Sequence, residues 1–100
     1  MNDLTWIYVV TNPSFPKYVK VGWTRHNPHK RIGDIDTTGV PTPFDLNYVA
    51  CVDDARKLEK LTHQFLDRHR VRSSREFFEV SAMFAREAIR SVALHSGIGL

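Results

Sequence analysis

Three polar residues at spacings of four and seven share one edge of a predicted amphipathic helix: Glu59, His63 and Arg70. Glu59 is the best candidate metal ligand, because Mg²⁺ is commonly held by one carboxylate together with waters and phosphate oxygens. The alternative is a surface carboxylate that pairs with Arg56 or His63. His63 is a candidate second metal ligand, proton shuttle or support for Glu59. We favour the supporting role, because one histidine plus one glutamate is a thin metal motif.

Basic residues suited to a phosphate group lie on both sides of these positions. Arg31 would present a planar fork of donors and stay charged, although a lone arginine in a helix is ordinarily just solvated. The segment 68–75 contains four arginines, which could follow a nucleic-acid backbone with little base specificity. A solvated loop fits this segment nearly as well. Those arginines are Arg68, Arg70, Arg72 and Arg75.

Length and composition favour one small soluble domain. The chain has 100 residues, 42% of them hydrophobic and 25% charged, so there is room for a single modest core. A formal charge of +3 suits a polyanionic partner without requiring one. Cys51 is the only cysteine, which excludes an internal disulfide; its apolar surroundings predict a small core residue. No signal peptide and no stretch near the ~20 apolar residues of a membrane span is found, so we expect a cytoplasmic protein without a membrane partner.

Two strands near the start of the chain divide their residues between two faces. Odd positions are aliphatic and would enter one core, and even positions would share the other face. If Val10 pairs with Tyr18, then Tyr8 lies directly opposite Lys20. Gly22 ends the second strand and would let backbone or ligand approach closely. The odd set is Ile7, Val9, Val19 and Val21, and the even set is Trp6, Tyr8, Val10, Tyr18, Lys20 and Gly22.

The remaining elements predict an α+β fold with a small antiparallel sheet of about three strands flanked by helices. Strands are expected at Thr5–Thr11, Tyr18–Trp23 and Phe44–Val52, with a short edge strand within Glu76–Val80. Helices are expected from Asn27-Pro28 to about Asp36, from Asp53 or Asp54 to about Arg70, and from Ser81 to about Ser96, ended by Gly97. The apolar stripes of the last two helices are Ala55, Leu58, Leu61, Phe65 and Leu66, then Phe84, Ala88, Ile89 and Val92.

Several motifs occur in an order that resembles the GIY-YIG nuclease domain. The resemblance is closest to its small phage-type branch, the T5orf172/Mug113-like domains, in which the second triplet reads Lys-Ile-Gly. It covers roughly residues 5–80 and suggests a phage or mobile-element origin. The motifs are Trp6-Ile7-Tyr8, Lys20-Val21-Gly22, Arg31-Ile32, Val40-Pro41-Thr42-Pro43-Phe44, Glu59 through His63, and Arg75-Glu76-Phe77-Phe78.

The resemblance implies a metal-dependent endonuclease that hydrolyses DNA phosphodiester bonds with Mg²⁺ or Mn²⁺. Tyr8 would be the general base or would position water, Lys20 and Arg31 would bind phosphate, and Glu59 would hold the metal, with His63 beside it. The chain shows no extra DNA-reading segment, so we expect low sequence specificity and a monomer or weak homodimer. The residues expected to contact substrate are Gly22, Trp23, Arg70, Arg72, Arg75 and Glu76.

This sequence departs from the family pattern at two positions. Trp6 replaces the usual glycine of the first triplet, and Lys20 replaces the tyrosine of the more common second triplet. A lysine can stabilise a phenolate or contact phosphate, so the second departure is compatible with catalysis. The alternative is a catalytically degenerate module that binds nucleic acid or regulates a host protein. Metal-dependent cleavage separates the two hypotheses.

Overall fold

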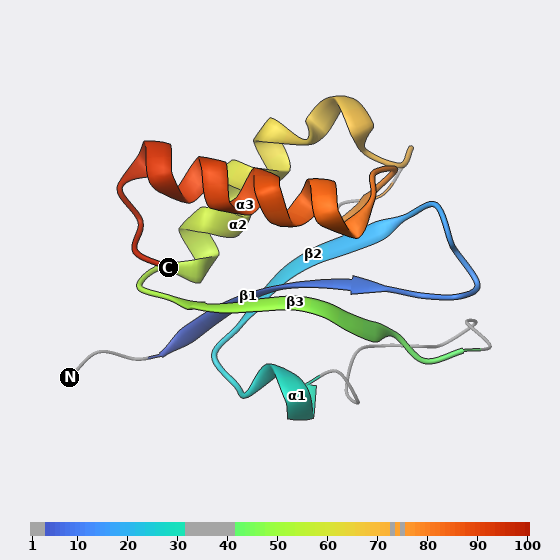
Figure 1. Ribbon diagram of the computed structural model, residues 1–100, viewed down its shortest axis with the longest axis horizontal. Helices are drawn as coiled ribbons and strands as arrows, with labels where there is room; N and C mark the ends of the chain where they lie inside the picture. Colours follow the sequence, from blue (N-terminus) through green and yellow to red (C-terminus); the bar gives the residue numbers. More distant parts are fainter. Residues whose placement is uncertain (1–3, 32–41, 73, 75) are drawn as a thin grey trace.

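Four strands form one antiparallel sheet in the order β3-β1-β2-β4. The computed structural model describes residues 4–31, 42–72, 74 and 76–100, with Arg31 described as backbone only. Helices α2 and α3 cover one face of the sheet, and the short helix α1 lies on the opposite face (Figure 1). The strands are β1 (Thr5–Thr11), β2 (Val19–Thr24), β3 (Asp45–Val52) and β4 (Phe77–Phe78), and the helices are α1 (Pro28–Arg31), α2 (Ala55–Phe65) and α3 (Ala82–Ser96).

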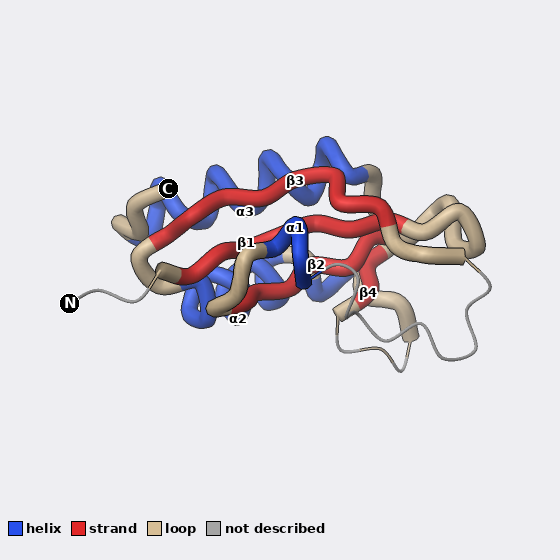
Figure 2. Tube along the Cα trace, turned by 90° about the horizontal axis from the view of Figure 1, so that it is seen from below, coloured by secondary structure: helices blue, strands red, loops and turns tan. Residues whose placement is uncertain are grey.

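This arrangement confirms the α+β prediction. The fourth strand is the short edge strand expected within Glu76–Val80, and it pairs with β2 at two positions only (Figure 2). Within the described ranges, no helix has both the length and the apolar composition that a membrane span requires.

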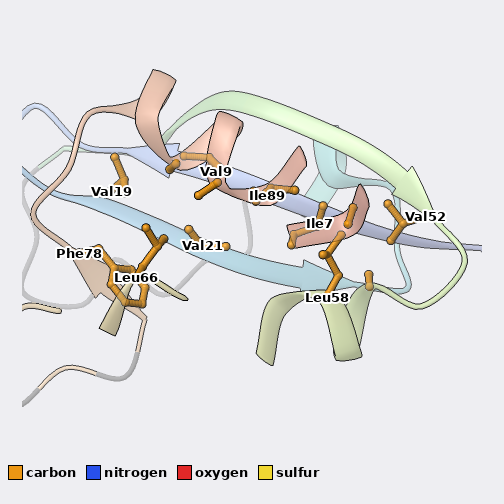
Figure 3. Packing of buried hydrophobic residues seen from close by; sticks show 13 residues of the cluster. Ile7, Val9, Val19, Val21, Val52, Leu58, Leu66, Phe78 and Ile89 are labelled. Carbon is orange, nitrogen blue, oxygen red and sulfur yellow. The ribbon is translucent and has the colours of Figure 1, made fainter. Parts of the chain in front are cut away.

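The main core lies between the sheet and the pair α2 and α3, as the odd positions of the hairpin predict. Residues from β1 and β2 alternate in and out, so one aliphatic row per strand enters this core. Helix residues, among them Leu58 and Ile89, pack against these rows (Figure 3). The labelled members are Ile7, Val9, Val19, Val21, Val52, Leu58, Leu66, Phe78 and Ile89.

The register of the hairpin differs from the predicted one. Tyr8 pairs with Gly22, and Lys20 pairs with Val10, so the expected Tyr8–Lys20 pair is wrong. The cause is the turn, which extends through Tyr18: the Tyr18 N–H donates to Phe15 O at 3.0 Å. Because the shift is two residues, every side chain keeps its predicted face.

Buried hydrogen bonds of Asn12 fix this turn. The Asn12 Nδ2 donates to Thr42 O at 2.7 Å, and Asn12 Oδ1 accepts from the Ser14 N–H at 2.8 Å. The Phe15 N–H donates to Asn12 O at 2.8 Å. Asn12 therefore binds the hairpin turn to the segment that leads into β3. The two residues are 30 positions apart, so the local sequence of the turn does not predict this contact.

A bulge in β3 divides its side chains differently from a regular alternation. Val9 pairs with Tyr48 and Val10 pairs with Leu46, which leaves Asn47 as the extra residue. Beyond the bulge, Val49 joins Leu46 on the face away from α2 and α3. Cys51 of β3 is exposed, so its predicted place in the core is wrong.

Helix α2 ends five residues before the predicted end. Asp54 caps its start, with the Lys57 N–H donating to Asp54 Oδ1 at 3.1 Å. After Phe65 the chain tightens into a 3₁₀ turn over Asp67–His69. Arg70 then adopts an extended conformation, so its predicted place on the helix is wrong. The buried row follows Ala55, Leu58, Thr62 and Leu66, which leaves Phe65 56% exposed.

The caps of the other helices match the sequence. Ser81 Oγ accepts from the Phe84 N–H at 3.0 Å, and Gly97 ends α3 with φ of 68°. Phe84 itself is 46% exposed, because Ala85 takes the inward position that was expected for Phe84. Asn27 Oδ1 accepts from the His29 N–H at 2.9 Å and caps α1. The predicted end of this helix near Asp36 lies outside the described residues.

Candidate active site

Among the described residues, no strand pairs with the outer edge of β2 after Lys20, and side chains of α2 take over its hydrogen bonding. The Val21 N–H still donates to Glu76 O at 3.2 Å. His63 Nε2 donates to Val21 O at 2.8 Å, and Glu59 accepts a hydrogen bond from the Trp23 backbone N–H. The one-turn spacing predicted for Glu59 and His63 therefore lets α2 bind backbone groups along one strand edge.

Glu59 and His63 lie one turn apart on α2 and both face this edge. His63 Nδ1 lies 4.0 Å from Glu59 Oε1, and their side chains are 13% and 18% exposed. Because the Val21 carbonyl can only accept, His63 Nε2 carries the proton. In the neutral form of the ring, the lone pair is therefore on Nδ1, on the side of the Glu59 carboxylate.

The protein shifts the pKa values of Glu59 and His63 in the directions that favour their neutral forms. Burial, followed by the negative charge of Glu76, raises the pKa of Glu59 to about 7, against the hydrogen bond from Trp23 and the charge of Lys20. Burial lowers the pKa of His63 below 6.5, and the nearby charge of Arg70 lowers it further, while the Val21 hydrogen bond and Glu76 act against this. The neutral form of His63 offers a lone pair to a cation, whereas Glu59 does so once it has lost its proton, at a pH near or above 7.

Glu59 and His63 fit a cation that keeps most of its water or phosphate ligands. Among the described residues, no group of three or more His, Cys, Asp or Glu side chains is arranged to hold a metal ion. A site on this edge would use the Glu59 carboxylate, with His63 Nδ1 beside it. Mg²⁺ bound mainly by waters and phosphate oxygens needs no more protein ligands than that.

Lys20 and Glu76 extend the site toward the junction of β2 and β4. Lys20 Nζ lies 3.2 Å from Glu76 Oε2, and the lysine side chain is more buried than the glutamate. Glu76 also raises the pKa of Glu59, and Lys20 acts on it in the opposite direction. Lys20, Glu76 and Glu59 are thus electrostatically coupled.

Arg70 reaches the same site from the segment after α2. Its Nη2 donates to His63 O at 3.5 Å, and its Nη1 donates to Ser74 O at 3.4 Å. The guanidinium lies 4.9 Å from the centre of the Phe78 ring and pairs with Asp67 at 3.0 Å. The grouping of Arg70 with Glu59 and His63 is therefore found, although tertiary folding rather than helix periodicity produces it.

Tyr8 lies on the other face of the sheet, on the side of α1. It is 5% exposed, and its phenol packs so close to Gly22 that any side chain at position 22 would collide with it. Lys20 lies on the same face, two residues along β2 from Gly22. Tyr8 therefore contacts Gly22 of β2, and Glu59 binds the backbone of the next residue, Trp23.

The other predicted site residues are only partly placed. Arg31 ends α1 on the face of Tyr8, and its side chain lies outside the description (Figure 1). Arg75 is outside the described residues. Arg72 is exposed in the turn before β4.

The structure adds residues to the site that sequence reasoning missed. A groove along α2 is lined by Arg56, Lys57 and Lys60 together with Trp23, and it opens beside Glu59, His63 and Arg70. Arg56 and Lys60 lie one helical turn apart, which was the signal available in the sequence. The exposed Arg25 lies over the Trp23 ring, with its Cζ 5.1 Å from the ring centre.

Comparison with known proteins identifies the family. The model of the T5orf172 domain matches residues 5–93, which include every element from β1 to most of α3. The chain belongs to the T5orf172 domain family. No curated protein and no solved structure matches it.

Proposed function

We propose that this protein is a GIY-YIG-type endonuclease that hydrolyses DNA phosphodiester bonds with Mg²⁺ or Mn²⁺ and has low intrinsic sequence specificity. The observation that carries the proposal is the pairing of Glu59 and His63 at the open edge of β2, with Lys20 close by. Membership of the T5orf172 domain family supports a function on nucleic acid.

Each residue of the proposed site has one task. Glu59 holds the metal, and His63, bound to Val21 O, supports it by anchoring the next turn of α2 to the edge of β2. Lys20 and Arg31 bind the phosphate, since both offer charged donors. A metal held by Glu59 would supply positive charge for the transition state. Tyr8 positions or deprotonates the attacking water, and Gly22 gives it room.

Cleavage assays with matched variants test the proposal. Supercoiled plasmid and end-labelled single strands are incubated with Mg²⁺, Mn²⁺ or EDTA. We expect metal-dependent nicking that Glu59→Gln and Arg31→Ala abolish, while Glu87→Gln, an exposed carboxylate on α3, leaves it unchanged. Cleavage that persists in EDTA or in Glu59→Gln would contradict the proposed metal site. Nucleic-acid binding without any cleavage would instead favour a degenerate binding module.

A further inference from the structure

The groove along α2 has the composition of a site for an unpaired nucleic-acid strand. Among the described residues, four cationic side chains and two carboxylates line it. One carboxylate, Asp54, already caps α2, and the other is Glu59. The cations that α2 contributes lie on consecutive turns, so they would follow a line of phosphates. The four cations are Arg56, Lys57, Lys60 and Arg70.

An aromatic side chain lies within this charged surface. Trp23 is half-buried: its indole packs against the main core and also borders the groove. One face of the ring is covered by the exposed guanidinium of Arg25. This face belongs to a second cavity, which Arg25 lines and which adjoins the groove at Trp23 and Arg56. A base would stack on the ring there in place of the guanidinium.

An aromatic ring beside a row of basic side chains favours an unpaired strand over a duplex as the ligand. In a duplex, the faces of the bases are covered by their neighbours, so an indole cannot stack on them without unpairing. Proteins that bind single strands use a positive groove for the backbone and aromatic rings for the bases. The groove has a volume of about 590 Å³, which lies within the roughly 300–1,000 Å³ typical of ligand pockets.

We propose that the α2 groove binds a single-stranded DNA segment next to the scissile phosphate, with a base stacked on Trp23 and phosphates on Arg56 and Lys60. This inference rests on the proposed nuclease function and names its substrate class: DNA with an unpaired strand at the cleavage site. Because Trp23 donates its backbone N–H to Glu59, the stacked base would be adjacent to the proposed metal ligand.

The test is a binding assay in EDTA, where no cleavage interferes. A labelled 12-nucleotide single strand and a blunt-ended duplex of the same sequence are titrated by fluorescence anisotropy at several salt concentrations. We expect tighter binding of the single strand. Arg56→Gln and Lys60→Gln should each lower the salt dependence, by about 0.7 in the logarithmic slope for each phosphate that is no longer neutralised. The matched control is Arg90→Gln, an exposed arginine of α3, which should change nothing.

Two substitutions of Trp23 separate stacking from packing. Trp23→Leu keeps apolar volume against the core but removes the aromatic face, and it should weaken single-strand binding roughly tenfold. Trp23→Phe keeps an aromatic face and should bind within about threefold of the unmodified chain. In a Trp6→Phe background, Trp23 is the remaining tryptophan, and its fluorescence should be quenched by the single strand.

The binding assay and the cleavage assay test the two proposals separately. Equal affinity for the duplex and the single strand, or unchanged binding in both Arg56→Gln and Lys60→Gln, would overturn the inference even if the protein cleaves DNA. Single-strand binding that responds to these variants, in a protein that never cleaves, would support the groove as a single-strand site but reject the nuclease proposal and, with it, the placement beside a scissile phosphate.

Discussion

Gly22 lies directly against the phenol of Tyr8. A Cβ at position 22 would be 2.5 Å from both Cζ and the hydroxyl oxygen of Tyr8, closer than real side chains approach each other. The two residues are direct partners in the β1–β2 pairing, so the ring lies across its opposite neighbour. The glycine of the second triplet is therefore required by the tyrosine of the first, a relationship that links two motifs 14 residues apart.

Gly22→Ala should displace the Tyr8 ring and lower both stability and cleavage. We expect a loss of about 1–3 kcal/mol in the free energy of unfolding, as for other overpacked sites, and at least a tenfold loss of nicking. Urea denaturation and the plasmid assay measure the two effects. The control is Gly97→Ala at the end of α3, where φ of 68° makes alanine costly but no active-site residue lies nearby. Its stability should fall by about 1 kcal/mol while the rate stays unchanged; equal loss of activity in both variants would contradict this account.

Metal binding should strengthen as pH rises through about 7. Glu59 must lose its proton to bind a cation, and its pKa is raised to about 7. Below that value, the affinity for Mn²⁺ should increase up to tenfold per pH unit, and above it the affinity should level off. Isothermal titration at pH 6, 7 and 8 measures this dependence. A constant affinity across this range would show that Glu59 is not the titrating ligand.

Without metal, the same group should make stability fall with rising pH. The folded state holds the Glu59 proton more tightly than the unfolded chain, so this contribution is complete below pH 4.5 and is lost as pH rises to about 7. His63 acts in the opposite direction, because its lowered pKa costs stability as pH falls below 6.5. Glu59→Gln should remove the Glu59 contribution and leave that of His63, so that the variant's stability rises relative to that of the unmodified chain as pH increases from 4.5 to 7. Unfolding at a series of pH values with EDTA present tests this.

Glu76→Gln should shift the pH dependence of metal binding to lower pH. The charge of Glu76 is the second cause of the raised pKa of Glu59, so its removal should lower that pKa. The substitution also releases Lys20 from the ion pair at 3.2 Å, which should cost at most about 1 kcal/mol in stability. Glu79→Gln, an exposed carboxylate on the same segment, is the matched control. An unchanged midpoint in Glu76→Gln would exclude the proposed coupling.

Two substitutions at His63 separate its two ring nitrogens. His63→Ala removes the hydrogen bond to Val21 O and should cost about 1 kcal/mol in stability. His63→Gln can still donate to that carbonyl but lacks Nδ1, so stability should be retained. Both variants should bind Mn²⁺ roughly tenfold more weakly, as expected for a residue that supports a metal ligand. Full metal affinity in His63→Gln would limit His63 to a purely structural role. His95→Ala, which removes an exposed hydrogen bond to Ser91 O, is the control.

The sequence alone determined the features of this fold that depend only on residues close together in the chain. Period-two alternation assigned Ile7, Val9, Val19 and Val21 to the core, and their burial confirms it. Asp54, Ser81 and Gly97 fixed helix ends, because a cap depends on residues within one turn. The spacing of four between Glu59 and His63 placed both side chains on one helix edge for the same reason.

Tertiary structure decided the features that depend on contacts between distant segments. The turn that sets the hairpin register is also held by Asn12 binding Thr42, and the bulge in β3 changed which residues share a face. Arg70 joined Glu59 and His63 because the chain turns back after Leu66, which helix periodicity cannot predict. The hydrogen bonds between α2 and the edge of β2 arise because the pairing of β2 with β4 ends at Lys20. A sequence records which groups are present, but the pKa of Glu59 depends on burial and on Glu76, and folding brings both to it.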